Sequence, residues 1–287
     1  MLTRRGFLCS TAGLASTSLA RAASGYQIGC YTRPWDQFDY RVALDGIAEA
    51  GYKYAGLMTH KGKTWVIITV ATAPEEAAAI GEQVRQRGLE TTSIYGGNFP
   101  VEKSLEAGIA GLRRLIDNSA ACRSPRLLLG GTGKAELVEP YYKAVQECCD
   151  YAADKGVALS VKPHGGANAT GAQCRKIIET VGHRNFRVWY DPGNIYFYSQ
   201  GQIDPVEDVP SVDGLIAGMS IKDFQPPKEV LITPGTGKVD FRAVLARARR
   251  GGFTSGPLVV ECLNPGDAGA VTAEARKARE FLERLTA

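Results

Sequence analysis

Three charged residues each end an apolar run in the second half of the sequence. Lys162 follows VALSV, Asp191 follows FRVWY and Glu261 follows PLVV. A carboxylate in such a position can act as a general base or hold a cation, and an ammonium can stabilise an oxyanion. The carboxyl ends of all strands in an α/β barrel face one mouth. These three side chains would therefore meet if the chain folds as such a barrel.

Strand-like apolar runs alternate with helical segments along the chain. The eight runs cover 26–32, 52–57, 89–97, 125–131, 157–166, 186–194, 215–223 and 257–262. The intervening segments place apolar residues three and four apart and end at Gly or another small residue. Eight such units in ~250 residues predict an α/β fold of one domain, a (β/α)8 TIM barrel. The assignment is least definite at 61–72, where TWVIITV could be an extra strand or a loop.

The first two dozen residues have a different character. The motif Thr3-Arg4-Arg5-Gly6-Phe7-Leu8 opens a stretch without acidic residues that ends in Ala20-Arg21-Ala22, a small-x-small cleavage pattern. This stretch resembles a twin-arginine signal peptide, which implies Tat export machinery and a periplasmic or secreted bacterial protein. We therefore expect a signal over 1–22 and the barrel over 23–287. The apolar part is too short and too rich in Ser and Thr to be a stable membrane anchor.

The charge of the chain argues against a nucleic-acid partner. The sequence has 34 Lys and Arg against 30 Asp and Glu. Arg4, Arg5 and Arg21 would leave with the signal, so 34 − 3 = 31 basic residues would face 30 acidic ones. A nearly neutral domain lacks the basic excess that binds a phosphate backbone.

The cysteines do not form a metal-binding pattern. None of the six that follow the predicted signal belongs to a zinc-type framework of paired Cys and His. Cys30 lies on the first predicted strand and Cys262 on the last, which are neighbours in a closed barrel. A disulfide between them could form in an oxidising compartment, but core packing is the interpretation that we prefer.

The strand ends KPHGG, YDPGN, SIKDF and VVEC, joined through PGTGKVDF, resemble the xylose isomerase-like TIM barrel family. That family includes sugar phosphate isomerases/epimerases, ketose 3-epimerases and inosose dehydratases, with the endonuclease IV group as a distant branch. The resemblance implies a divalent metal, Mn or Mg, between a Glu on strand five, an Asp on strand six, a His on strand seven and a Glu on strand eight. Asp191 and Glu261 match. Lys162 and Ser220 stand where the first Glu and the His are expected.

These two departures leave alternatives open. His164 lies two residues after Lys162, on the same face of the strand, and could complete a metal site with Asp191 and Glu261. Alternatively, the ammonium of Lys162 replaces the metal. Three carboxylates and a divalent cation carry −3 + 2 = −1, and Lys162 with its two carboxylates carries +1 − 2 = −1. We slightly prefer this metal-free interpretation. In a third, Lys162 merely neutralises an acidic pair.

Further polar residues near strand ends are candidates for binding a substrate. Asn194 could contact a substrate hydroxyl, and Lys222 could bind an anionic or hydroxylated substrate. Asp223 is expected to cap the following loop. After the first strand, where Arg33 also lies, Trp35 could stack on the apolar face of a sugar.

The three histidines of the sequence differ in their expected positions. His60 follows the second strand and could join the mouth beside His164. His183 precedes a strand and is expected at the opposite, stability face. Endonuclease-type chemistry needs a zinc cluster with many His, Asp and Glu ligands, so three histidines argue against DNA repair.

Two functions are consistent with these residues. The first is an exported enzyme of the sugar isomerase/epimerase type that abstracts a proton next to a carbonyl of a sugar, polyol or keto-sugar. Glu261 would be the general base, and Lys162 or a metal would stabilise the enolate. Without the strand-five Glu, isomerisation or elimination suits the site better than a two-base epimerisation, unless His164 is the second base. The second function is a periplasmic carbohydrate-binding or accessory protein on a catalytically altered barrel.

Overall fold

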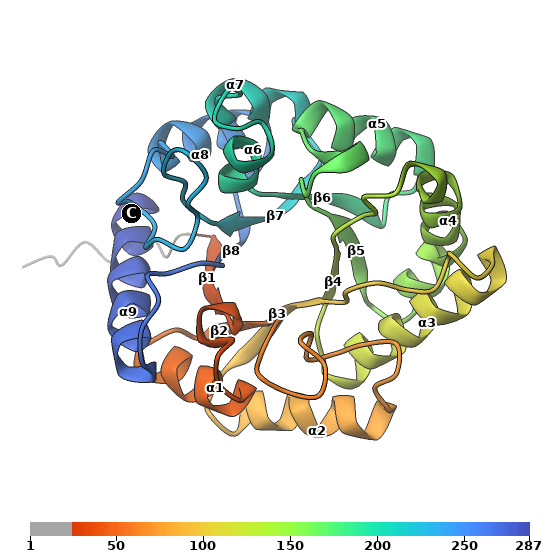
Figure 1. The fold of residues 1–287 in the computed structure, drawn as a ribbon, viewed down its shortest axis with the longest axis horizontal. Coiled ribbons are helices and arrows are strands. Elements are labelled where there is room, and N and C mark those ends of the chain that lie inside the picture. Colours follow the sequence, from red (N-terminus) through yellow and green to blue (C-terminus); the bar gives the residue numbers. More distant parts are fainter. Residues whose placement is uncertain (1–24) are drawn as a thin grey trace, which may run out of the picture.

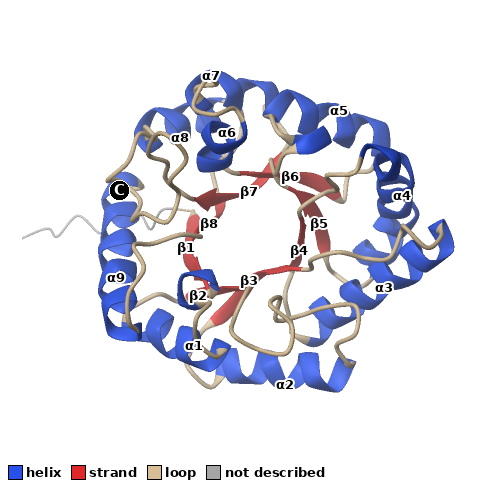
Figure 2. Cartoon of the chain, viewed as in Figure 1, coloured by secondary structure: helices blue, strands red, loops and turns tan. Residues whose placement is uncertain are grey.

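A closed barrel of eight parallel strands forms the centre of the molecule, which is described here as a computed structural model over residues 25–287. The strands are β1 (Tyr26–Tyr31), β2 (Tyr54–Leu57), β3 (Glu90–Tyr95), β4 (Arg126–Leu129), β5 (Ala158–Val161), β6 (Phe186–Tyr190), β7 (Ile216–Ile221) and β8 (Gly256–Val260). They pair in chain order, and β8 pairs with β1 (Figures 1 and 2). The predicted single-domain TIM barrel is confirmed.

Helices form a ring around the barrel (Figure 1). They are α1 (Tyr40–Glu49), α2 (Pro74–Arg85), α3 (Leu105–Ala121), α4 (Val138–Asp154), α5 (Gly171–Val181), α6 (Pro192–Tyr198), α7 (Pro205–Asp208), α8 (Phe241–Arg250) and α9 (Ala268–Leu285). Each long helix buries one apolar stripe, as its spacing of apolar residues requires. No helix in the described part of the chain is long and apolar enough to cross a membrane.

The segment 61–72 is a loop in the structure. Its only ladder contact is one isolated antiparallel bridge between Thr59 and Val66. Ile67 and Ile68 are buried in the core, which explains why the run is apolar although it forms no strand. The loop alternative is therefore correct.

Aromatic and aliphatic side chains fill the barrel interior below its mouth. Tyr31, Trp189 and Val259 belong to a buried cluster that also includes residues of β4 and of the segment after β2. Gly56 makes room for this packing, because a Cβ there would lie 2.2 Å from the Tyr31 ring. Successive inward residues of a strand are two apart. Asp191 and Glu261, which lie two residues beyond Trp189 and Val259, therefore form a polar layer above this plug.

The described cysteines are all free and buried. Cys30 lies on β1, whereas Cys262 lies two residues beyond the end of the neighbouring strand β8, and both are almost completely inaccessible. Burial raises the pKa of the Cys30 thiol well above its usual range, and the neighbouring Cys262 raises it further. Both residues pack as small apolar groups in the core.

Candidate active site

The ammonium group of Lys162 lies between the two predicted carboxylates. Its Nζ donates to Glu261 Oε1 at 2.9 Å and to Oε2 at 2.8 Å. Asp191 Oδ2 lies 3.0 Å from the same nitrogen, as an ion pair without hydrogen-bond geometry. All three residues are buried, with 1% of Lys162 exposed. The structure thus brings together the strand ends of β5, β6 and β8, and the buried Asp191 Oδ2 is ion-paired but accepts no hydrogen bond in the described residues.

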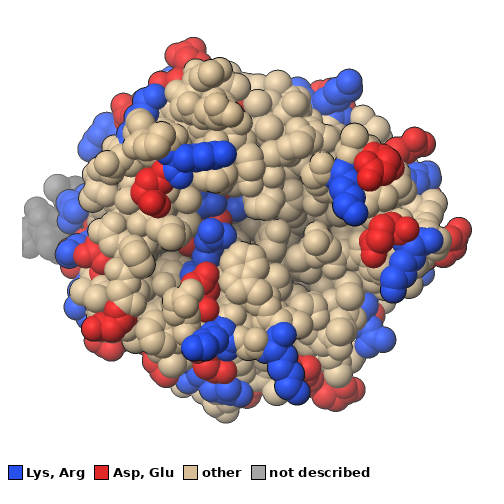
Figure 3. Space-filling view, in the orientation of Figure 1, with Lys and Arg blue, Asp and Glu red and all other residues tan. Residues whose placement is uncertain are grey.

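Two more cations join this group from other strands. Lys222, at the end of β7, places Nζ 2.6 Å from Glu261 Oε1 and 3.4 Å from Asp191 Oδ2. Arg33, after β1, places Nη1 3.9 Å from Glu261 Oε1. We call these five residues the charge cluster: Arg33, Lys162, Asp191, Lys222 and Glu261. Figure 3 shows the mouth of the barrel as a hollow in which atoms of both signs are visible.

The residue at the expected histidine position also contacts the base candidate. Ser220 Oγ donates to Glu261 Oε2 at 2.7 Å, and Trp189 Nε1 donates to Ser220 Oγ at 3.1 Å. Ser220 is fully buried. This chain of hydrogen bonds fixes the orientation of the Glu261 carboxylate from the side of the barrel interior, where Trp189 lies.

Two asparagines position the lysines. Asn194 Oδ1 accepts from Lys222 Nζ at 3.0 Å, while its Nδ2 donates to the Pro163 carbonyl at 2.6 Å. Both ends of this side chain are engaged, so Asn194 orients Lys222. It does not present a free amide to a substrate, which differs from the prediction made from the sequence. Asn168 donates to the Lys162 carbonyl at 2.7 Å. No sequence motif indicates this role for Asn168, which lies in a 3-10 helix (Gly166–Asn168) after β5.

The cluster holds Glu261 and Lys222 in their charged forms. Burial alone would raise the pKa of Glu261, but Lys162, Lys222 and Arg33 outweigh it and keep that pKa well below 4.5. Burial alone would lower the pKa of Lys222, whereas Asp191 and Glu261 raise it above 10.5. Glu261 is consequently an ionised carboxylate and, while both lysines contact it, a weak base.

His164 lines the mouth as a neutral imidazole. Burial first, and then the charges of Lys162 and Lys222, lower its pKa to about 3. Its ring centroid lies 6.5 Å from that of Tyr95 and 5.7 Å from that of Tyr198. His164 and Tyr95 border a cavity of about 530 Å³ whose wall also includes Phe99 and Tyr141. A sugar-sized molecule fits a cavity of this volume.

The residues present do not fit the divalent metal that the family implies. Ammonium groups of Lys162 and Lys222 already contact the oxygens of Asp191 and Glu261 that would be metal ligands. Within residues 25–287, no three His, Cys, Asp or Glu side chains group in a way that could hold a metal ion. His164 therefore does not complete a site with the two carboxylates, contrary to the metal interpretation. A cation would have to displace two buried ammoniums.

Of two further predicted mouth residues, one is buried in the core and the other makes no contact with the charge cluster. Trp35 is fully buried between α1 and α9, where its Nε1 donates to the Ala268 carbonyl at 3.3 Å. Its ring is core and cannot stack on a sugar, so this prediction is wrong. His60 packs edge-on against Tyr40 of α1, with 5.7 Å between ring centroids. No contact of the His60 side chain with the charge cluster is observed in the described residues.

Asp223 organises the loop that follows β7. Its two carboxylate oxygens accept hydrogen bonds from the backbone N–H groups of four loop residues, Phe224, Gly235, Gly237 and Val239, at 2.8 to 3.0 Å. Asp223 is fully buried, and these contacts are those of a loop cap. His183 lies before β6 and contacts Asp150 at 2.9 Å, at the face opposite the mouth.

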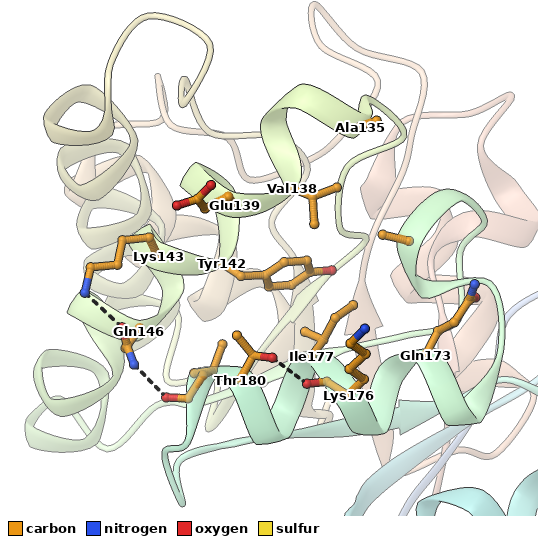
Figure 4. Close-up of a pocket in the computed structure, with 12 residues that line it drawn as sticks. Ala135, Val138, Glu139, Tyr142, Lys143, Gln146, Gln173, Lys176, Ile177 and Thr180 are labelled. Atoms are coloured by element: carbon orange, nitrogen blue, oxygen red, sulfur yellow. Dashed lines mark hydrogen bonds between the residues drawn. The ribbon is translucent and has the colours of Figure 1, made fainter.

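A second cavity lies on the outside of the barrel, between α4 and α5 (Figure 4). Its volume is about 580 Å³, and its lining includes Val138, Tyr142 and Ile177. No member of the charge cluster lines it. This groove is separate from the candidate active site.

Comparison with known proteins gives the family. The sequence model of the family described as xylose isomerase-like TIM barrel matches residues 44–285 of this chain. A comparison with curated proteins gave no significant match. The similar solved structures include a xylose isomerase domain protein from Planctomyces limnophilus, with 19% identity, a TM-score of 0.69, and 91% of this chain and 97% of that chain covered.

Two further similar structures have names that include an activity. D-allulose 3-epimerase from Methylomonas sp., in complex with D-allulose, shares 18% identity with a TM-score of 0.70, over 91% of this chain and 97% of that chain. L-ribulose 3-epimerase shares 15% identity with a TM-score of 0.71, over 91% and 94%. At these identities the likeness concerns the fold. With the family match over most of the sequence, the chain belongs to the xylose isomerase-like TIM barrel family.

Proposed function

We propose that this protein is an enzyme of the sugar isomerase/epimerase type that moves a proton next to a carbonyl of its substrate at the mouth of the barrel. The observation that carries this proposal is the position of Lys162 Nζ, within 3.0 Å of both Asp191 and Glu261. An ammonium there supplies the positive charge that stabilises an enolate as it forms. No step in this scheme uses a metal.

Glu261 is the proton acceptor in this scheme. A substrate carbonyl oxygen that draws Lys162 or Lys222 toward itself weakens the contacts that depress the pKa of Glu261. The carboxylate becomes a stronger base at the moment when the ammonium begins to stabilise negative charge on the substrate. Asp191 keeps the ammoniums in place, and its Oδ2 can accept a hydrogen bond from a substrate hydroxyl.

One carboxylate base favours isomerisation or elimination over epimerisation. A two-base epimerisation needs proton-transfer groups on opposite faces of the same carbon. His164 is the candidate for the second group, because its neutral imidazole lines the same mouth. The sugar class itself is supported by the similar structures, among them D-psicose 3-epimerase solved in the presence of D-fructose.

A carbohydrate-binding protein without turnover is the second candidate. The observation that favours it is the state of Glu261, whose two oxygens receive hydrogen bonds from Lys162 and Ser220 and an ion pair from Lys222. A carboxylate held in this way binds well and deprotonates poorly. In this case the mouth would recognise a sugar and leave it unchanged.

Proton exchange separates the two functions. The protein would be incubated with keto- and aldo-sugars in D2O, and loss of the proton next to the carbonyl would be followed by NMR. The enzyme proposal predicts exchange that falls ~100-fold or more in Glu261→Gln and falls steeply in Asp191→Asn, with Glu147→Gln on the exposed face of α4 as the control. Saturable binding without exchange would select the binding protein. Unchanged exchange in both variants would place the chemistry elsewhere.

We also propose export by the twin-arginine route, as Arg4, Arg5 and the Ala20-Arg21-Ala22 pattern suggest. These residues lie outside the described part of the chain. Export of a folded protein is compatible with a barrel whose first and last strands must pair to close it.

A further inference from the structure

We infer that the substrate is a sugar acid and that Arg33 binds its carboxylate. This inference rests on the proposed function and specifies the substrate class of the same mouth. It starts from the charge of the cluster. Three cations, Arg33, Lys162 and Lys222, lie within 4.0 Å of two carboxylates, so the cluster carries +3 − 2 = +1.

The surplus charge is not neutralised through an ion pair with Asp36, whose charge acts on Arg33 from a greater distance, or with the nearby Asp223. The oxygens of that carboxylate face the loop after β7 and accept four backbone N–H groups. No ion pair joins Asp223 to Lys222 or Arg33 among the described residues. A buried surplus charge is costly unless a ligand of opposite sign completes the site.

Arg33 is the cation whose donors are still available. Lys162 and Lys222 have side chains that are 2% and 5% exposed and are engaged with the carboxylates. The Arg33 side chain is 26% exposed, and its one ion pair within the described residues, at 3.9 Å, is too long for a hydrogen bond. Its buried Nε has no hydrogen-bond partner there. A guanidinium with free donors suits the two oxygens of a carboxylate.

Arg33 follows β1 and His164 follows β5, so both residues lie at the carboxyl end of the barrel. The rings of His164 and Tyr95 lie side by side, with 6.5 Å between their centroids. Both of these rings border the cavity of about 530 Å³. No member of the charge cluster lines this cavity, so a sugar whose carboxylate lies against Arg33 would extend across the mouth toward it.

The net charge of +1 on the charge cluster is matched better by a carboxylate than by a phosphate. A carboxylate carries one negative charge and brings the cluster to +1 − 1 = 0. A phosphate ester carries about −1.5 to −2 at neutral pH and would leave an excess of negative charge in a buried site. The charge balance therefore indicates a monoanionic sugar rather than a sugar phosphate.

The test compares ligands that differ at one carbon. Binding of D-glucuronate, D-glucose and D-glucose 6-phosphate to the full chain would be measured by calorimetry at matched ionic strength. We expect D-glucuronate to bind at least tenfold more tightly than the other two. Arg33→Gln should weaken D-glucuronate binding by roughly 10- to 100-fold and weaken D-glucose binding by a much smaller factor. Arg33→Lys should recover part of the loss.

Arg41→Gln is the matched control, because Arg41 is exposed on α1 and pairs with Asp39. It should bind all three ligands like the parent protein. Equal affinity for D-glucose and D-glucuronate, tighter binding of the phosphate, an unaffected Arg33→Gln variant, or no binding of any of the three would overturn the inference. Its failure is distinct from that of the enzyme proposal. Exchange on neutral sugars alone would refute only the acid preference, and D-glucuronate binding without proton exchange would refute only turnover.

Discussion

Lys162 and Glu261 are joined across the mouth of the barrel by two hydrogen bonds, although their strands are not neighbours. β5 and β8 are separated by β6 and β7 in the barrel order. Lys162 Nζ nevertheless reaches both oxygens of Glu261, at 2.9 and 2.8 Å. The pair therefore links two non-adjacent strands through side chains alone. It spans the polar layer that lies above the buried apolar cluster of the barrel interior.

Removing the ammonium should destabilise the fold. Lys162→Met leaves Glu261 and Asp191 with Lys222 as their one close ammonium, and breaking a buried ion pair costs about 3 kcal/mol or more. We expect urea denaturation at pH 7 to show a loss of that order. Lys143→Met, which removes an exposed pair with Glu147, should change the free energy of unfolding by less than about 0.5 kcal/mol. Equal stability of Lys162→Met and the parent would contradict the role of this ammonium.

Because His164 is neutral in the fold, the free energy of unfolding should decrease as the pH is lowered. Its pKa falls from 6.5 in a free side chain to about 3 in the fold, first through burial and then through Lys162 and Lys222. The unfolded chain then binds one more proton than the folded chain between these pH values. Stability from this residue is complete above pH 6.5 and decreases as the pH falls toward about 3.

The slope due to His164 is measurable by denaturation at a series of pH values. Between pH 6 and 5 the titration of one proton costs about 1.4 kcal/mol per pH unit at most. His164→Gln should reduce this slope, and His183→Gln, at the opposite face, should keep it. A slope that His164→Gln does not change would show that the imidazole is already protonated or exposed in the fold.

Asp223 should keep the loop after β7 closed. Asp223→Ala removes the acceptor of four backbone N–H groups, and unsatisfied amides favour opening of the loop. We expect trypsin to cleave after Lys228 and Lys238 at least several-fold faster in this variant. Asp267→Ala, which removes the N-cap of α9, should not alter cleavage at these two sites. Unchanged cleavage in Asp223→Ala would mean that other contacts hold the loop.

The export proposal depends on the paired arginines. Arg4→Lys combined with Arg5→Lys should leave the uncleaved precursor in the cytoplasm, because both residues of the twin-arginine motif are lost. Cell fractionation and the size of the protein on a gel measure this. Normal periplasmic accumulation of the double variant would refute the assignment.

The barrel and its charged centre could be predicted from sequence for one physical reason. Each strand is a short apolar run, and the residue after it must lie at the common mouth, which places Lys162, Asp191 and Glu261 together. The surroundings could not be predicted in this way. Trp35 also follows a strand, yet Gly46 of α1 leaves space against its ring, and only the packing of helices distant in sequence shows this.

Contacts among long polar side chains were also beyond sequence reasoning. The place of Arg33 after the first strand does not reveal that its guanidinium lies 3.9 Å from the Glu261 carboxylate. Asn194 was expected to contact substrate, and its amide is instead used by Lys222 and the Pro163 carbonyl. Which of several polar groups pair with each other depends on rotamers and distances that the order of residues does not encode.

Metal content tests the central claim most directly. Protein purified without chelator would be examined by elemental analysis, and its melting temperature would be measured with and without Mn, alongside Lys162→Glu and Asp191→Ala. Lys162→Glu restores the strand-five carboxylate that the family uses. If the ammonium replaces the cation, the parent protein contains far less than one equivalent of metal, and Mn raises the melting temperature of Lys162→Glu alone. One equivalent of metal in the parent, lost in Asp191→Ala, with an equal Mn shift in the parent, would contradict this account.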